Sequence, residues 1–328
     1  MQAAVHCVII GFSETAALAK VRLFSSDNQF DIVSNISPYL VAAPTVFVEA
    51  HSHPVSSNAP VLQNGGKPTE GGHLILTQEE RDDLLRAEPQ AAPFLRPFMM
   101  GKDFLHRAPR YCLWLVHAEP ALLKRCPRVL ERVEAVRAFR LDSKKPAPRR
   151  KAETPMLFDE VRECTSNYVA IPKVSSENRR YIPMDYLPKE IIPGDNLFML
   201  QDATLYHFGI LMSNVHMAWM RAVAGRMKSD YRYSTSIVYN NFPWPTPTPE
   251  QTAAIKKTAQ AILDARELYP DSSLADLYDE VLMPKELREA HRANDRAVMR
   301  AYGFPIKMTE ADCVAALMQR YEQLTAGK

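Results

Sequence analysis

Short apolar runs separated by polar loops recur through the first half of the chain. Runs that are rich in β-branched and aromatic residues and bounded by Pro, Gly, Asn or Ser are typical of β-strands. The pattern predicts strands at residues 3–12, 45–50, 73–77, 111–116 and 168–174. The run at 3–12 is apolar enough to be a buried strand, and a buried strand needs neighbours in a sheet. We therefore expect it to belong to a domain that begins upstream.

Helical signals appear between these runs. Thr77 followed by Glu80 matches a capping box and predicts a short helix that starts there. Residues 122–140 have helical composition interrupted at Pro127, and residues 205–227 form the longest central helix candidate, with apolar side chains near one face. These strands and helices alternate without a regular repeat.

A proline-rich segment at 243–249, PWPTPTP, predicts a linker between two regions. Beyond it, nearly every residue favours helix, and Thr248 and Thr309 stand at predicted helix starts. The pattern therefore predicts an α+β fold. A mixed domain with short strands and a long central helix precedes a small all-α C-terminal region.

Composition bounds the class of protein. The chain has 328 residues, 46% of them hydrophobic, which is enough for a sizeable core and about two domains. Its formal net charge is only +2, so an argument for nucleic acid must rest on clustered charge. Five cysteines without a CxxC pair suit a reducing cytosol rather than a disulfide scaffold or zinc ribbon. No membrane span or signal peptide is evident, so we expect a cytoplasmic protein.

Basic and polar residues gather in two neighbouring segments. Residues 137–151, RAFRLDSKKPAPRRK, hold seven Lys or Arg against one acid, and their prolines are expected to keep the second half out of a helix. Residues 173–183, KVSSENRRYIP, offer side chains of the types that hold phosphates and read base edges. A solvated loop and a charged turn are the simpler alternative.

Glu177 and Arg179 form the sharpest pair in the second segment. In an extended segment, residues i and i+2 point to the same face and could address one base pair. Arg can donate to O6 and N7 of guanine, and Glu can accept from N4 of cytosine. A salt bridge between the two is the alternative.

Two further segments have one functional and one structural interpretation each. The loop at 64–72, NGGKPTEGG, could bring backbone N–H groups and Lys67 to a phosphate, or it could be a turn that needs positive φ angles. Residues 225–234 interleave Arg226, Lys228 and Arg232 with tyrosines, and could equally be the cationic end of a helix.

Catalytic motifs are missing from the sequence. It contains no GxGxxG, P-loop, GxSxG or HExxH pattern, and His51 and His53 have no third metal ligand at suitable spacing. Asp142-Ser143-Lys144 matches a nuclease fragment too short to be informative. We therefore predict no catalytic residue and no metal ligand.

Seven sequence blocks occur in the order found in one family. They are residues 64–77, 110–115, 139–147, 173–183, 206–234, 238–245 and 277–304. Together these blocks resemble the MmeI-like family of type IIG/IIL restriction-modification enzymes and related bacterial DNA adenine methyltransferases. The resemblance extends from Val8 to Phe304.

The resemblance implies a domain order. Residues 1–15 would be the last strand of a methyltransferase domain, 16–245 a target recognition domain and 246–328 a C-terminal helical region. The family's glycine-containing cofactor motif and its Asn-Pro-Pro-Tyr motif do not occur here. S-adenosylmethionine would accordingly bind in the parent's methyltransferase domain and not in this chain. That domain would be joined in cis, or it would act in trans on a stand-alone specificity subunit.

The resemblance also implies a role for particular residues toward double-stranded DNA. The family's SSExR motif reads an outer base pair, which carries over to Glu177 and Arg179, and the segment around 143–150 resembles the one that reads inner positions. The expected base readers are Lys144, Lys145, Glu177 and Arg179. The expected backbone contacts are Lys67, Arg149, Arg150, Lys151, Arg180, Arg226, Lys228 and Arg232. A complete enzyme with an unfamiliar fold is a further alternative, disfavoured by the missing motifs.

Overall fold

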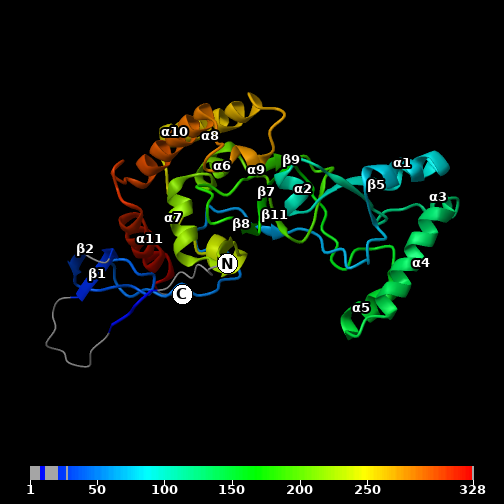
Figure 1. Cartoon of the computed structure of the whole chain (residues 1–328), viewed down its shortest axis with the longest axis horizontal. Helices are drawn as coiled ribbons and strands as arrows, with labels where there is room; N and C mark the ends of the chain where they lie inside the picture. Colours follow the sequence, from blue (N-terminus) through cyan, green and yellow to red (C-terminus); the bar gives the residue numbers. More distant parts are fainter. Residues whose placement is uncertain (1–7, 12–20, 27–28, 327–328) are drawn as a thin grey trace, which may run out of the picture.

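The structure is a computed structural model that describes residues 8–11, 21–26 and 29–326. It is an elongated α+β molecule with a large body, which carries the C-terminal helices, and a smaller lobe at the other end of its long axis (Figure 1). Buried side chains form two apolar clusters, one in each part. The predicted α+β class with a helical C-terminal region is confirmed.

The smaller lobe is built on a four-stranded sheet of order β10-β5-β6-β4. Its strands are β4 (Ile75–Leu76), β5 (Leu95–Met99), β6 (Arg110–Leu113) and β10 (Ile192–Pro193). Its helical segments are α1 (Gln78–Ala87), η1 (Pro89–Phe94), α3 (Pro120–Leu123), α4 (Pro127–Leu141), α5 (Pro146–Arg150) and η2 (Lys151–Glu153), and α2 (Gly101–Leu105) joins it to the body. The predicted capping box is present, because the Thr77 hydroxyl accepts from Glu80 N and the Glu80 carboxylate accepts from Thr77 N.

The body contains two small sheets, of order β3-β11-β7-β9 and β12-β13-β8. The first consists of β3 (Gln63–Asn64), β7 (Tyr168–Pro172), β9 (Asp185–Leu187) and β11 (Leu197–Gln201), and the second of β8 (Val174–Ser175), β12 (Gly225–Met227) and β13 (Asp230–Arg232). Every residue of β7 is buried. The helical segments α6 (Leu205–Leu211), α7 (Asn214–Val223) and η3 (Thr235–Tyr239) pack beside these sheets.

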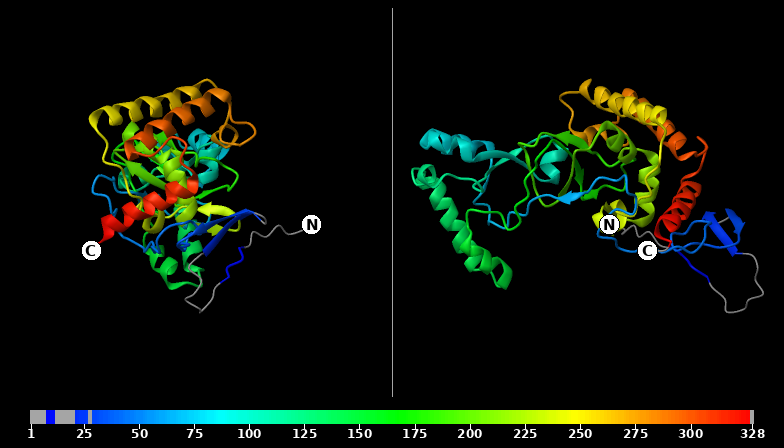
Figure 2. Two further views of the ribbon diagram at one scale, coloured as in Figure 1. Left: turned by 90° about the vertical axis from the view of Figure 1, so that its left-hand side faces the viewer. Right: turned by 180° about the vertical axis from the view of Figure 1, so that it is seen from behind.

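The C-terminal helices cover the body rather than form a separate bundle (Figure 2). They are α8 (Pro249–Glu267), α9 (Leu274–Leu277), α10 (Lys285–Tyr302) and α11 (Glu310–Thr325). Helix α8 packs on α6, where a Cβ added to Gly209 would lie 2.7 Å from Ile255 Cγ2. The proline-rich segment before α8 is partly built into the core, since Trp244 is buried and the Tyr302 hydroxyl donates to the Pro243 carbonyl at 2.9 Å.

Two predicted strands are not present in the described residues. Residues 8–11 are irregular and exposed, and the rest of the run at 3–12 lies outside the described residues. Residues 45–50 are also irregular, because their N–H groups bond to side chains rather than to a neighbouring strand: Val48 N donates to the Tyr39 hydroxyl at 2.9 Å. The strands β1 (Val21–Ser26) and β2 (Gln29–Val33) form a separate antiparallel hairpin.

The predicted long central helix is wrong in its extent. It is divided into α6 and α7 at Ser213, whose hydroxyl accepts from His216 N and starts a new helix. A serine that satisfies a free N–H in this way favours a helix start over a helix interior. The last predicted residues, Gly225–Met227, are strand β12.

Candidate nucleic-acid interface

The segment 173–183 leaves β8 in a tight turn rather than in an extended conformation. Arg179 N donates to the Ser176 carbonyl at 3.1 Å, and Asn178 N donates to the Ser176 hydroxyl at 3.3 Å. The prediction that Glu177 and Arg179 share the face of an extended strand is therefore wrong. Serine hydroxyls that accept from a backbone N–H two residues later favour turns over strands, which explains the difference.

The turn directs its side chains differently from the predicted geometry. Glu177 and Arg179 are both half-buried. Burial lowers the pKa of the Arg179 guanidinium, and the carboxylates of Asp230 and Asp279 act in the opposite direction.

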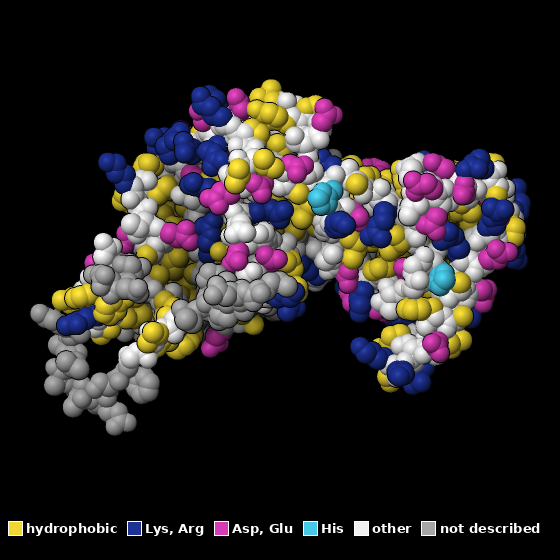
Figure 3. Space-filling model, viewed as in Figure 1, with side chains coloured by type: hydrophobic (Ala, Val, Ile, Leu, Met, Phe, Trp, Pro, Cys, Tyr) yellow, Lys and Arg dark blue, Asp and Glu magenta, His cyan; other side chains and the backbone are white. Residues whose placement is uncertain are grey.

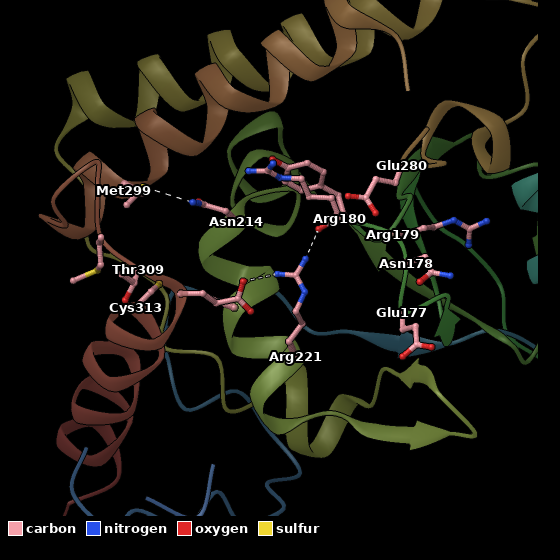
Figure 4. Close-up of a pocket in the computed structure, with 14 residues that line it drawn as sticks. Glu177, Asn178, Arg179, Arg180, Asn214, Arg221, Glu280, Met299, Thr309 and Cys313 are labelled. Carbon is pink, nitrogen blue, oxygen red and sulfur yellow. Dashed lines mark hydrogen bonds and ion pairs between the residues drawn. The ribbon is translucent and has the colours of Figure 1, made fainter. Parts of the chain in front are cut away.

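A cavity of about 530 Å³, here called the recognition cavity, lies beside this turn. Its other walls come from α7, from the start of α11 and from α10 (Figure 4). Arg221 fixes two of these walls, because it donates to the Glu310 carboxylate at 3.0 Å and to the Arg180 carbonyl at 2.8 Å. Residues from four distant parts of the sequence thus meet around one space.

The recognition cavity offers both donors and acceptors. Three arginines and three glutamates line it, together with Asn178 and Asn214. The Asn214 Oδ1 atom is buried and has no hydrogen-bond partner among the described residues. Such a mixed lining suits base edges, which carry both donors and acceptors, better than it suits a row of phosphates.

A buried polar network holds the segment after the turn in place. The Tyr181 hydroxyl donates to Asp295 of α10 at 2.7 Å, and the other Asp295 oxygen accepts from Asn214 N at 2.8 Å. The Tyr181 ring stacks on His291 with ring centroids 4.0 Å apart. Burial raises the pKa of Asp295, while these hydrogen bonds oppose that shift. The C-terminal region therefore anchors the turn and α7 together.

Residues 225–234 form a hairpin, which excludes the interpretation of this segment as a helix end. Strand β13 pairs with β8, so the hairpin extends the sheet that carries the turn. The Arg226 guanidinium lies over the Tyr231 ring, 3.9 Å from its centroid, and Lys228 occupies the hairpin tip at φ 58°. Arg226, Lys228 and Arg232 are exposed.

The basic stretch is helical in its second half, contrary to prediction. Pro146 is the first residue of α5, where a helix needs no N–H donor, so it starts the helix instead of blocking it. Lys144, Lys145, Arg149 and Arg150 are exposed around α5. The Lys151 ammonium donates to the Asp159 carbonyl at 2.9 Å.

Arg140, in the same stretch, is a structural residue. Its guanidinium is fully buried, and it donates to five backbone carbonyls at 2.7–3.3 Å. Those carbonyls belong to residues 68, 69, 151, 154 and 157, so Arg140 joins α4 to the glycine-rich loop and to the chain after α5. Burial lowers its pKa, and Asp159 and Glu70 oppose that shift.

The glycine-rich loop at 64–72 is held by its own contacts. Lys67 pairs with Asp159 at 3.3 Å, and the buried Glu70 carboxylate accepts from Gly72 N and Leu74 N. Gly71 has φ +70°, as the turn interpretation of this loop requires. The structure thus favours a structural role for the glycines.

The expected DNA-facing residues are distributed over both parts of the molecule. Lys144, Lys145, Arg149 and Arg150 lie around α5 at the free end of the smaller lobe, whereas the turn, Arg180 and the hairpin belong to the body (Figure 1). The surface is hollowed between the two parts, and basic side chains stand on the tip of the smaller lobe (Figure 3). Asn214 and Arg221 were not singled out from the sequence, because nothing in a helix sequence shows which polar residue faces a distant turn.

No glycine lines the recognition cavity or a second, smaller cavity of the described residues. No three His, Cys, Asp or Glu side chains gather to hold a metal ion in that part of the chain. None of its helices is long and apolar enough to cross a membrane.

The fold and the cavity define a recognition module, in which a rigid α+β scaffold presents polar side chains from a turn. The family model described as MmeI, target recognition domain, matches residues 42–246, and the model of the MmeI C-terminal domain matches residues 247–327. The chain belongs to the MmeI target recognition domain family.

Two relatives show how much of a longer protein this chain corresponds to. DNA methyltransferase A of Bacillus subtilis (strain 168) is 36% identical over 323 residues, which are 98% of this chain and 36% of the relative. The Type IIL restriction-modification enzyme MmeI, solved in complex with DNA, superposes with a TM-score of 0.87 at 38% identity, over 94% of this chain and 41% of MmeI. The chain therefore spans well under half the length of either relative.

Proposed function

We propose that this chain recognises a specific sequence in double-stranded DNA, as the target recognition part of a cytoplasmic N6-adenine DNA methyltransferase of restriction-modification type. The observation that carries this proposal is the superposition of 94% of the chain on an enzyme solved with DNA, at a TM-score of 0.87. The mixed lining of the recognition cavity and the exposed basic side chains around the hollow support it.

In this proposal the two kinds of contact are divided between residues. Glu177 and Arg179 read base edges from the turn, and Lys144 and Lys145 read them from the smaller lobe. Backbone phosphates are held by Arg149, Arg150, Lys151, Arg180, Arg226, Lys228 and Arg232, which fix the register of the protein on the duplex. Lys67 contributes least to phosphate binding, because its ammonium is already paired with Asp159.

Methyl transfer in this proposal belongs to a methyltransferase domain that uses S-adenosylmethionine. That cofactor supplies the methyl group, and the residues of this chain hold the duplex so that an adenine can leave the stack. Linkage in cis is the simpler arrangement, since both relatives are much longer than this chain. A separate specificity subunit would instead restore methylation when mixed with a methyltransferase polypeptide that lacks its own recognition domain.

The test is sequence preference in the full-length parent. Changing Glu177→Ala with Arg179→Ala should alter the methylated sequence at one position, and Arg179→Ala alone should cost on the order of 1–3 kcal/mol of discrimination there. Non-specific binding should change little, because phosphate contacts supply it. Methylation mapping of cells that express each variant measures the outcome.

Glu190→Ala with Arg292→Ala, at two exposed sites outside the recognition cavity, is the matched control and should leave the methylated sequence intact. A stable Glu177/Arg179 double variant with an unchanged methylation motif would remove both residues from base readout. Loss of folding stability with an unchanged motif would assign them a structural role.

A further inference from the structure

A second cavity, of about 310 Å³, lies on the body where β8, β13 and η3 meet. Lys173 and Arg232 stand at the ends of the β8–β13 pairing and line it, and Ser234, Thr235 and Ser236 line it from the start of η3. His51 closes it from the long loop before β3. We name this cavity the cationic pocket.

The charge of the cationic pocket has one sign. Lys173 and Arg232 line it, and none of the described residues in its lining is Asp or Glu. The recognition cavity differs, since glutamates balance its arginines. A small cavity with two cations and no acid attracts an anion.

Both cations have donors to spare. Lys173 lies 4.6 Å from the centroid of the Phe198 ring and donates one hydrogen bond, to Asn64 at 2.6 Å, although an ammonium has three donors. No hydrogen bond or ion pair joins the Arg232 guanidinium to any residue that the structure describes. Planar guanidinium and ammonium donors of this kind are the usual partners of phosphate oxygens.

A buried hydroxyl adds an independent observation. The Thr235 Oγ1 atom is enclosed and has no hydrogen-bond partner among the described residues. Leaving a buried hydroxyl without a partner is unfavourable, and an anion bound in the pocket would accept a hydrogen bond from it. Ser234 differs, since its hydroxyl already accepts from Ile237 N.

We propose that the cationic pocket binds one backbone phosphate of the duplex, with Lys173, Arg232 and the Thr235 hydroxyl as its donors. This inference rests on the proposed function. Only three residues separate Lys173 from Glu177, so their Cα atoms are at most about 14 Å apart. A phosphate held here fixes the distance between the DNA backbone and the turn that reads bases.

The experiment compares two variants of the whole chain in duplex binding. Thr235→Val removes the hydroxyl while keeping the side-chain shape, and Arg232→Gln removes one charge. Fluorescence anisotropy with a labelled 20-base-pair duplex, over a range of salt concentrations, should show roughly tenfold weaker binding for each. The slope of log affinity against log salt should fall by about 0.9 for Arg232→Gln and stay unchanged for Thr235→Val.

Two controls carry the same chemical changes elsewhere. Thr246→Val and Arg292→Gln, at exposed positions outside the pocket, should bind the duplex like the unchanged chain. The melting temperature of Thr235→Val should be equal or higher, because no partner among the described residues loses a bond. Weaker binding with unchanged melting thus separates a ligand contact from a folding defect.

The outcomes distinguish the pocket from the proposed function. If the unchanged chain does not bind duplex at all, the proposed function and the pocket both fall. If the unchanged chain binds duplex, and Thr235→Val and Arg232→Gln both bind it as tightly as the unchanged chain does, only the proposal for the pocket is contradicted. Inorganic phosphate is the second probe: if it raises the melting temperature of the unchanged chain but not of Thr235→Val, while both bind duplex alike, the pocket holds free phosphate and the DNA assignment is overturned.

Discussion

Single buried polar residues hold the segments around the interface. Arg140 satisfies five carbonyls in the smaller lobe, and Asp295 joins Tyr181 to the first residue of α7. His216 connects α7 to the chain after the hairpin, because its Nδ1 lies 2.9 Å from the Leu211 carbonyl and its Nε2 lies 3.0 Å from the Tyr233 hydroxyl. A buried polar group loses its hydrogen bonds to water and needs protein partners in their place. Its partners are therefore held at hydrogen-bonding distance, which fixes the relative positions of the segments that carry them.

His216 should make folding stability depend on pH. Burial lowers its pKa from the ordinary 6.5 to about 4, although its bond to the Leu211 carbonyl opposes the shift. The unfolded chain therefore binds the proton first, and stability present above pH 6.5 is lost as the pH falls toward 4. The loss should be on the order of 3 kcal/mol for this residue alone. Chemical denaturation at several pH values measures it.

His216→Gln should flatten this dependence, and His106→Gln, at an exposed position, should not. Part of the slope should remain in His216→Gln, because burial also lowers the pKa of His291 well below its ordinary value. A free energy of unfolding that stays constant between pH 6.5 and 4 in the unchanged chain would contradict the prediction.

Short elements carry the expected phosphate contacts. Helix α5 has only five residues. The chain that follows it is held by Arg140, which donates to the Lys151 and Thr154 carbonyls. The β12–β13 hairpin is equally short, and its pairing with β8 makes it continuous with the turn. Isolated helices and hairpins of this length are unstable in water, so both elements depend on their contacts with the adjoining chain.

The α5 arginines should contribute to the salt dependence of DNA binding. Arg149→Gln with Arg150→Gln should lower the slope of log affinity against log salt by about 1.8, if each side chain meets one phosphate. Affinity should fall about equally for all duplex sequences, because phosphate contacts carry no base information. Duplex binding at four or more salt concentrations measures the slope.

Lys256→Gln with Lys257→Gln on α8 is the control for the same charge change, at two exposed positions. An unchanged slope in the α5 variant would leave α5 as a solvated helix with no contact to DNA. Lys151 is kept in this variant, since its ammonium also bonds the Asp159 carbonyl.

At the scale of the whole molecule, the larger of the two apolar clusters is shared between the regions matched by the two family models. Apolar contacts run without a break from the loop before β3 to α11. Helix α8 packs on α6, and α11 packs on α7. The buried Arg266 of α8 donates to the Met184 carbonyl at 2.9 Å and pairs with Asp185 at 3.3 Å, which adds polar links across the same contact.

Removal of the C-terminal region should therefore unfold the rest of the body. A chain that ends at Thr246 would expose the apolar faces of α6 and α7 and would lose the partners of Tyr181 and Asn214. We expect it to lack a cooperative thermal transition, which calorimetry and near-ultraviolet circular dichroism would show. A truncated chain that melts cooperatively within a few degrees of the full chain would contradict this prediction.

The sequence by itself determined the local signals and the class. Thr77, Thr248 and Thr309 were identified as helix starts because a cap depends on residues three positions apart, and each is an N-cap in the structure. The α+β class followed from alternating short strands and helices. The family followed from ordered sequence blocks, and the family models bear it out.

Only the tertiary structure decided which polar residues meet. The turn at Ser176–Arg179 replaced an extended segment, because a serine bond to the backbone competes with strand pairing. Residues 45–50 have the composition of a strand but no neighbouring strand to pair with. Asn214, Arg221 and Thr235 line cavities whose other walls come from helices and loops distant in sequence. Contacts of this kind depend on packing between elements, which local patterns along a chain do not encode.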